Sequence, residues 1–226
     1  MSASPQFFPF LLHTTAVAVM VYGYLHLPDV VGTMQMDKIK GGHFQFLTIQ
    51  GLCVACIAMV LSVACDLIPS AKILRTAKRA VLMSALPLSI VISAIYWTLL
   101  LTMPHMILTE SPSERMPTSS HTVPELERLD LTTDLALHAA PAISLIVDFY
   151  ALEPKYPKFA SRYGSVVVAA ILGTWYACWV EYCASFNGMF PYPFLTYNPF
   201  NIRVAIYFGA SLFAALAFMV MNALHR

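Results

Sequence analysis

The chain has 226 residues, of which 58% are hydrophobic and only 11% are charged. This composition is typical of an integral membrane protein, and it leaves no polar stretch long enough to form a separate water-soluble core. The formal net charge of +1 argues against a global electrostatic attraction to nucleic acid, so we expect membrane lipids to be the main partners.

Six apolar runs are long enough to cross a bilayer, because about 20 mostly apolar residues span its hydrocarbon core. They predict an all-α, polytopic protein whose helices form one bundle, as a single integral membrane domain over residues 1–226. A polar loop rich in Ser, Pro, Thr and Glu is expected at 105–129. The predicted helices lie near 7–27, 46–68, 81–104, 131–152, 164–186 and 202–224.

Lysine and arginine residues concentrate in the loops on one side of the predicted bundle. Because cytoplasmic loops carry an excess of these residues, we expect both termini in the cytoplasm. The segment 41–52, GGHFQFLTIQGL, is then expected on the lumenal or outer face. The basic residues on the expected cytoplasmic side are Lys72, Arg75, Lys78, Arg79, Lys155, Lys158, Arg162 and Arg226.

Ionisable side chains within the predicted spans indicate a functional site, because a charge in hydrocarbon is costly and tends to mark one. The predicted fourth helix contains Asp134, His138 and Asp148. Asp134 and His138 are four residues apart and therefore share one helical face. At 1.5 Å per residue, His138 lies roughly 10 Å below the outer end of that helix. Thr48 is somewhat shallower, about one turn into the second helix, so a hydroxyl and an imidazole reach similar depths.

Each of these polar residues also has a purely structural interpretation. A threonine in a membrane helix commonly bonds the carbonyl one turn earlier or a neighbouring helix, and a buried histidine can complete a structural hydrogen bond. Asp134 either orients His138 or caps the free N–H groups at the mouth of its helix. Glu181 is expected to face lipid headgroups beside Trp175 and Trp179, which suit an interfacial aromatic belt.

A hydroxyl beside an imidazole indicates acyl transfer. The hydroxyl attacks an ester carbonyl while the imidazole takes its proton, and the imidazole then returns the proton to the leaving alcohol. The free N–H groups in the first turn of the second helix are expected to stabilise the oxyanion, and Gly41 and Gly42 allow backbone to approach a substrate closely. The sequence has no phosphate loop, nucleophile elbow or HExxH motif, so we expect neither a cofactor nor a metal.

Three segments together resemble a known family. The segment 41–48, GGHFQFLT, resembles the Gly-Gly-x-aromatic-x-aromatic-Leu-Thr segment of the androgen-induced-gene and androgen-dependent TFPI-regulating protein family of transmembrane threonine hydrolases. Leu137 and His138, with Pro141 following, resemble the histidine helix of that family. The segment 188–195, GMFPYPFL, resembles its aromatic-proline signature. The order and spacing of the segments match, as does the six-helix layout, so the resemblance covers nearly the whole chain.

The resemblance implies that Thr48 is the nucleophile and His138 the base of a lipid esterase. It implies substrates that are fatty acid esters of hydroxy fatty acids, whose ester bond lies below the headgroup layer where a sunken nucleophile would meet it. It also implies a location in endomembranes or at the cell surface, and we expect the endoplasmic reticulum first. Asp134 is a supporting candidate from its position alone.

Two other hypotheses come from different classes of protein. A catalytically silent membrane scaffold or regulator of the same fold would tolerate replacement of Thr48 and His138. A haem-binding or transport protein would need histidine pairs facing each other at depth. His13 is the only other histidine well inside a predicted span, and it lies near the expected cytoplasmic end. The sequence therefore offers no pair of histidines at the same depth, which argues against the haem hypothesis.

Overall fold

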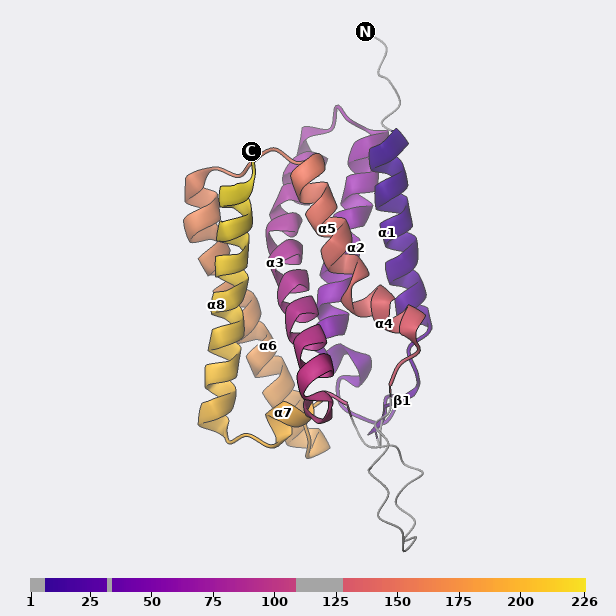
Figure 1. The fold of residues 1–226 in the computed structure, drawn as a ribbon, viewed down its shortest axis with the longest axis vertical. Coiled ribbons are helices and arrows are strands. Elements are labelled where there is room, and N and C mark those ends of the chain that lie inside the picture. The colour runs from indigo at the N-terminus through magenta and orange to yellow at the C-terminus, as the bar shows by residue number, and fades with distance from the viewer. Residues whose placement is uncertain (1–6, 32–33, 109–127) are drawn as a thin grey trace, which may run out of the picture.

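The computed structural model describes residues 7–31, 34–108 and 128–226. In these residues long helices run side by side, joined by short helical turns and one antiparallel pair of two-residue strands (Figure 1). The long helices are α1 (Phe7–Leu25), α2 (Leu47–Leu67), α3 (Lys72–Thr102), α4 (Leu131–His138), α5 (Ala140–Ala151), α6 (Ser165–Asn187) and α8 (Phe200–Leu224). The short elements are β1 (Val30–Val31), β2 (Met34–Gln35), η1 (Gly42–Gln45), η2 (Pro104–Met106), η4 (Ala160–Gly164) and α7 (Pro193–Thr196).

Five of the described helices are long and apolar enough to cross a membrane, and α4 with α5 forms a sixth candidate span, bent by 40°. The predicted all-α, polytopic membrane fold is therefore confirmed. The free ends of α1 and α8 lie at the same end of the bundle, at the top of Figure 1. The predicted polar loop at 105–129 falls mostly outside the described residues.

The third helix is longer than the sequence predicted. It begins at Lys72 rather than near residue 81, so the basic residues assigned to a loop form its first turns. The hydropathy of a segment reports the transfer of side chains into lipid, whereas a helix continues wherever its backbone hydrogen bonds do. The prediction of a loop was wrong because Lys78 and Arg79 have acidic partners within the protein, which removes the cost of keeping them at the end of a span.

The predicted fourth helix is two helices with a break between them. Helix α4 ends at His138 and α5 begins at Ala140, so that α4 meets the lower end of α5 obliquely in Figure 1. Pro141 causes the break, because it has no N–H to donate and its ring clashes with the carbonyl of Leu137, four residues earlier.

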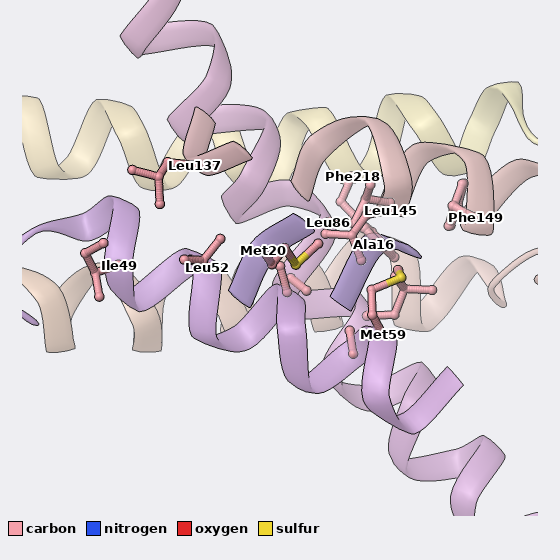
Figure 2. Close-up of a cluster of buried hydrophobic side chains, with 14 of the residues drawn as sticks. Ala16, Met20, Ile49, Leu52, Met59, Leu86, Leu137, Leu145, Phe149 and Phe218 are labelled. Carbon is pink, nitrogen blue, oxygen red and sulfur yellow. The ribbon is translucent and has the colours of Figure 1, made fainter. Parts of the chain in front are cut away.

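Small residues let helices α2 and α3 approach closely. Lipid tails are as apolar as leucine, so helices in a bilayer associate through van der Waals packing and polar contacts rather than a hydrophobic driving force. Gly51, Ala55 and Ala58 lie on one buried face of α2, and a Cβ at Gly51 would lie only 2.2 Å from Cδ1 of Ile92 on α3. The buried core of the bundle draws on α1, α2, α3, α4, α5 and α8 (Figure 2), and includes Met20, Leu52, Met59, Leu86, Leu137, Leu145, Phe149 and Phe218.

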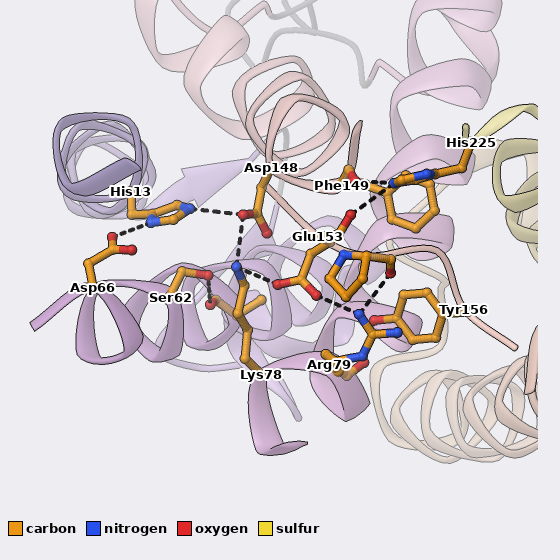
Figure 3. Close-up of polar contacts among 12 residues, drawn as sticks. His13, Ser62, Asp66, Lys78, Arg79, Asp148, Phe149, Glu153, Tyr156 and His225 are labelled. Carbon is orange, nitrogen blue, oxygen red and sulfur yellow. Dashed lines mark hydrogen bonds and ion pairs between the residues drawn. The ribbon is translucent and has the colours of Figure 1, made fainter. Parts of the chain in front are cut away.

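A buried network of charged side chains joins four helices at the upper end of the bundle (Figure 3). His13 on α1 contacts Asp66 of α2 at 2.6 Å and Asp148 of α5 at 2.9 Å. Lys78 on α3 bonds the same oxygen of Asp148 at 2.8 Å and reaches Glu153 at 2.8 Å. Each charge therefore has an opposite charge beside it, which a group removed from water requires.

We predict that Lys78→Met destabilises the protein by about 3–5 kcal/mol, because it leaves the carboxylate of Asp148 buried with one counterion fewer. The measurement is the midpoint of denaturant unfolding in detergent micelles. Lys158→Met is the matched control, since Lys158 is exposed. Equal losses of stability in the two variants would contradict a stabilising role for the network.

Candidate active site

The turn before helix α2 places Thr48 at the second position of that helix, nearer its start than the sequence suggested. Gly41 and Gly42 have φ values of +86° and +47°, in the left-handed region that glycine adopts without strain. We expected this pair to approach a substrate, whereas in the structure Gly41 lies close to helix α6, where an added Cβ would be 2.8 Å from Sγ of Cys183. Phe46 is then extended and leads into α2.

Side chains of α6 and α2 hold the turn in place. The indole N–H of Trp179 donates to the carbonyl of Phe44 at 2.9 Å, and the amide of Gln50 donates to the same carbonyl at 2.8 Å. The hydroxyl of Tyr176 donates to the carbonyl of Gln45 at 3.4 Å. The start of α2 is therefore anchored on α6, which limits how far Thr48 can move.

Thr48, His138 and Asp134 form a continuous chain of contacts between α2 and α4. Nδ1–H of His138 donates to Oδ1 of Asp134 at 2.7 Å, which leaves Nε2 as the acceptor that faces Thr48. Oγ1 of Thr48 lies 3.4 Å from that Nε2. The contact is slightly longer than the roughly 2.6–3.2 Å expected between a nucleophile and a general base. All three side chains are buried, so water does not compete strongly for these contacts.

Asp130, not Asp134, caps the start of helix α4. Its carboxylate accepts from the N–H groups of Thr132 at 3.0 Å and Thr133 at 3.1 Å. Hydrogen bonds from Thr132 and Thr133 hold the pKa of Asp130 well below its usual range. Of the two interpretations of Asp134, the geometry therefore favours orientation of His138.

Two tyrosines that the sequence analysis did not select complete the surroundings. The ring of Tyr96 lies flat on the imidazole of His138, with ring centroids 3.4 Å apart and an interplanar angle of 1°. The hydroxyl of Tyr192 lies 3.5 Å from the backbone N of Thr48. Tyr192 belongs to the GMFPYPFL segment, which could have pointed to it, whereas nothing in the sequence around Tyr96 distinguishes it from other apolar residues of α3.

Two cavities meet at Thr48. The first, of about 220 Å³, is almost wholly apolar and lies among α2, α3, α6 and α8. The second, of about 290 Å³, lies between the lower ends of α1, α3 and α4. Thr48, Tyr96, Ile107 and Tyr192 line both cavities, whereas His138 lines only the second. A molecule with two arms joined near Thr48 would fit this arrangement.

The second cavity has a polar rim formed by His26, His43, Arg128 and Asp130. Burial lowers the pKa of His43, with the charge of Asp29 opposing that effect. His43 is therefore a neutral hydrogen-bonding group at neutral pH, and Arg128 supplies a positive charge on this rim.

Two other acidic residues in the predicted spans are not part of this group. Asp148 lies in the charged network at the opposite end of the bundle. Glu181, expected to face lipid headgroups, pairs with Arg203 of α8 through bonds of 2.7 and 2.9 Å and accepts from the hydroxyl of Tyr207 at 3.0 Å. The carboxylate therefore has a charged partner within the protein, which the sequence prediction did not identify.

The fold and the polar residues within it define a multi-pass, helical integral membrane protein. The chain belongs to the FAR-17a/AIG1-like protein family, whose sequence model matches residues 8–226, and the predicted family resemblance is confirmed. It is 26% identical over 223 residues to a UPF0641 membrane protein of Schizosaccharomyces pombe, a match that covers 97% of this chain and 91% of the relative. No solved structure matches the chain.

We predict that Asp134→Asn lowers labelling of Thr48 by a fluorophosphonate probe at least about 100-fold, because an amide donor in place of the carboxylate favours the wrong tautomer of His138. The measurement is the rate of covalent labelling of purified protein at neutral pH. Asp37→Asn, the same change at an exposed position, is the control and is expected to label normally. Normal labelling of Asp134→Asn would exclude an orienting role for this carboxylate.

Proposed function

We propose that the protein is an intramembrane lipid esterase that hydrolyses fatty acid esters of hydroxy fatty acids. Thr48 is the nucleophile, His138 the general base and Asp134 the residue that orients the imidazole. The observation that carries the proposal is the buried contact of 3.4 Å between Oγ1 of Thr48 and Nε2 of His138, at the point where two cavities meet.

The chemistry follows from the protonation of these groups. Nε2 of His138 takes the hydroxyl proton as the oxygen of Thr48 attacks the ester carbonyl, and the resulting imidazolium is stabilised by Asp134. The C–O bond of the ester then breaks, and the imidazolium gives its proton to the departing alcohol. Water repeats the sequence on the acylated Thr48, releasing the fatty acid and restoring the hydroxyl.

The positions of the residues orient the ester between the two cavities. The departing alcohol must receive its proton from His138, which lines only the second cavity. The alcohol arm therefore belongs in the second cavity, beside its polar rim, and the acyl arm belongs in the apolar first cavity. Along α3 the first cavity extends from Tyr96 to Ser84, about 18 Å at the rise of an α-helix, which suits an extended acyl chain.

We further propose that both termini are cytoplasmic and that the site opens toward the lumenal half of the endoplasmic reticulum membrane or another endomembrane. Lys155 and Lys158 follow α5 at the end of the bundle where α1 begins, and Lys72 and Arg75 start α3 there. The positive-inside tendency favours the cytoplasm for this end.

Replacing either reacting group tests the proposal. In purified protein, Thr48→Ala and His138→Ala are each expected to lower hydrolysis of a fatty acid ester of a hydroxy fatty acid by at least about 10³-fold, since both groups act in the same step. Thr48→Ser keeps the hydroxyl and is expected to retain activity, which makes it the matched control. Labelling by the fluorophosphonate should follow the same order.

Two results would oppose the proposal in different ways. Full activity in folded Thr48→Ala and His138→Ala would show that another group performs the reaction. An unmodified protein that neither hydrolyses any lipid ester nor reacts with the probe would favour the catalytically silent scaffold.

We predict that Ala214→Phe shifts the preference of the enzyme toward shorter acyl chains. Ala214 lines the first cavity from α8. Helix α8 starts at the same end of the bundle as α2 (Figure 1), and Ala214 lies 14 residues along it, whereas Thr48 is in the first turn of α2. A phenyl ring at Ala214 would therefore fill the space used by the end of a long chain. The measurement is kcat/KM for a series of esters that differ only in acyl length. An equal loss for every chain length would place the acyl arm elsewhere.

A further inference from the structure

The hydroxyl of Tyr192 occupies the space in front of the first N–H groups of helix α2. It lies 3.5 Å from the N of Thr48, and the ring is held edge-on by Phe46 and stacked by Phe194, with centroid distances of 5.6 and 5.3 Å. The sequence predicts that these N–H groups stabilise the oxyanion directly. In the structure the tyrosine hydroxyl lies beside them and lines both cavities.

The proton of Tyr192 is available to an acceptor in the cavities. An N–H group of the helix occupies a lone pair of the hydroxyl oxygen, so the oxygen acts as acceptor toward the helix and as donor on its other side. Burial raises the pKa of Tyr192, with the neighbouring groups of Thr48, Leu47 and Tyr176 opposing that rise. The phenol therefore keeps its proton at neutral pH.

Nearby tyrosines are already engaged. The hydroxyl of Tyr176 donates to the carbonyl of Gln45 at 3.4 Å, and that of Tyr207 donates to Glu181 at 3.0 Å. Tyr96 packs against the face of His138. Of the tyrosines that line the first cavity, Tyr192 has its hydroxyl beside the backbone of the nucleophile.

We propose that Tyr192 is a catalytic residue that donates a hydrogen bond to the ester carbonyl oxygen as that oxygen becomes an oxyanion. The inference rests on the proposed esterase function. The carbonyl carbon attacked by Thr48 must lie beside Oγ1, which places its oxygen within reach of groups around the start of α2. The N-terminal end of a helix favours negative charge. The hydroxyl of Tyr192 accepts from that end and would donate its own proton to the oxyanion.

The test is Tyr192→Phe, which keeps the ring and removes only the hydroxyl. Loss of one oxyanion donor is expected to lower kcat about 100-fold, with KM changed less than about twofold. Tyr156→Phe is the matched control. Its hydroxyl donates to the carbonyl of Arg79 at 2.8 Å at the opposite end of the bundle, so its removal reports the cost of losing a buried tyrosine hydroxyl without touching the site.

Two ligands show whether Tyr192→Phe affects the transition state or only the binding of the lipid. A trifluoromethyl ketone lipid forms a tetrahedral adduct with an oxyanion, and its inhibition constant should rise about 100-fold in Tyr192→Phe. An ether analogue of the ester has no carbonyl, and its affinity should be unchanged. Equal weakening of both ligands, or an unchanged kcat in an active protein, would overturn the role of Tyr192. Absence of hydrolysis by the unmodified protein would instead overturn the esterase proposal itself.

A second substitution keeps the test decisive if Tyr192→Phe folds poorly. A fluorinated tyrosine at position 192 preserves the shape of the side chain and lowers the pKa of its phenol. Because a phenolate cannot donate a hydrogen bond, kcat should then fall at alkaline pH where the unmodified enzyme remains active. Identical pH profiles for the two proteins would contradict the proposal.

Discussion

The carboxylate of Asp148 must find its counterions inside the protein, because lipid hydrocarbon supplies none. It is fully buried and lies between His13 of α1 and Lys78 of α3, while His13 also contacts Asp66 of α2. These contacts fix α5 against three neighbouring helices at the upper end of the bundle. Helix α4 directly precedes α5 and is joined to it at Ala139. The contacts that hold α5 therefore also limit where α4, and with it His138, can lie.

The two ends of the bundle therefore use polar groups differently. At the upper end, opposite charges sit at 2.6–2.9 Å and neutralise one another. At the lower end, His138 has a single carboxylate partner in Asp134 and turns its other nitrogen toward the hydroxyl of Thr48. The imidazole of His138 therefore keeps a lone pair directed toward a cavity, whereas the charged groups at the upper end contact one another and hold the helices together.

Some features of the candidate site could be read from local sequence. The four-residue spacing of Asp134 and His138 places them on one helical face, and Gly41 and Gly42 indicate an unusual turn. Which neighbour each group meets could not be read in that way. Asp130 caps helix α4, and Asp134 instead contacts Nδ1 of His138. Glu181 is paired because Arg203 lies on the adjacent helix.

The multi-pass helical membrane fold and the family could both be predicted from the sequence, because apolar runs and short motifs are properties of neighbouring residues. The sequence prediction made α3 too short, because the helix continues past the hydropathy boundary at its start. It also missed the break between α4 and α5, which lies next to Pro141. Three contacts of the candidate site became visible only in the folded protein: Thr48 with His138, the ring of Tyr96 with the imidazole, and the hydroxyl of Tyr192 with the start of α2. Those contacts join residues far apart in the chain, and packing between helices alone sets their distances.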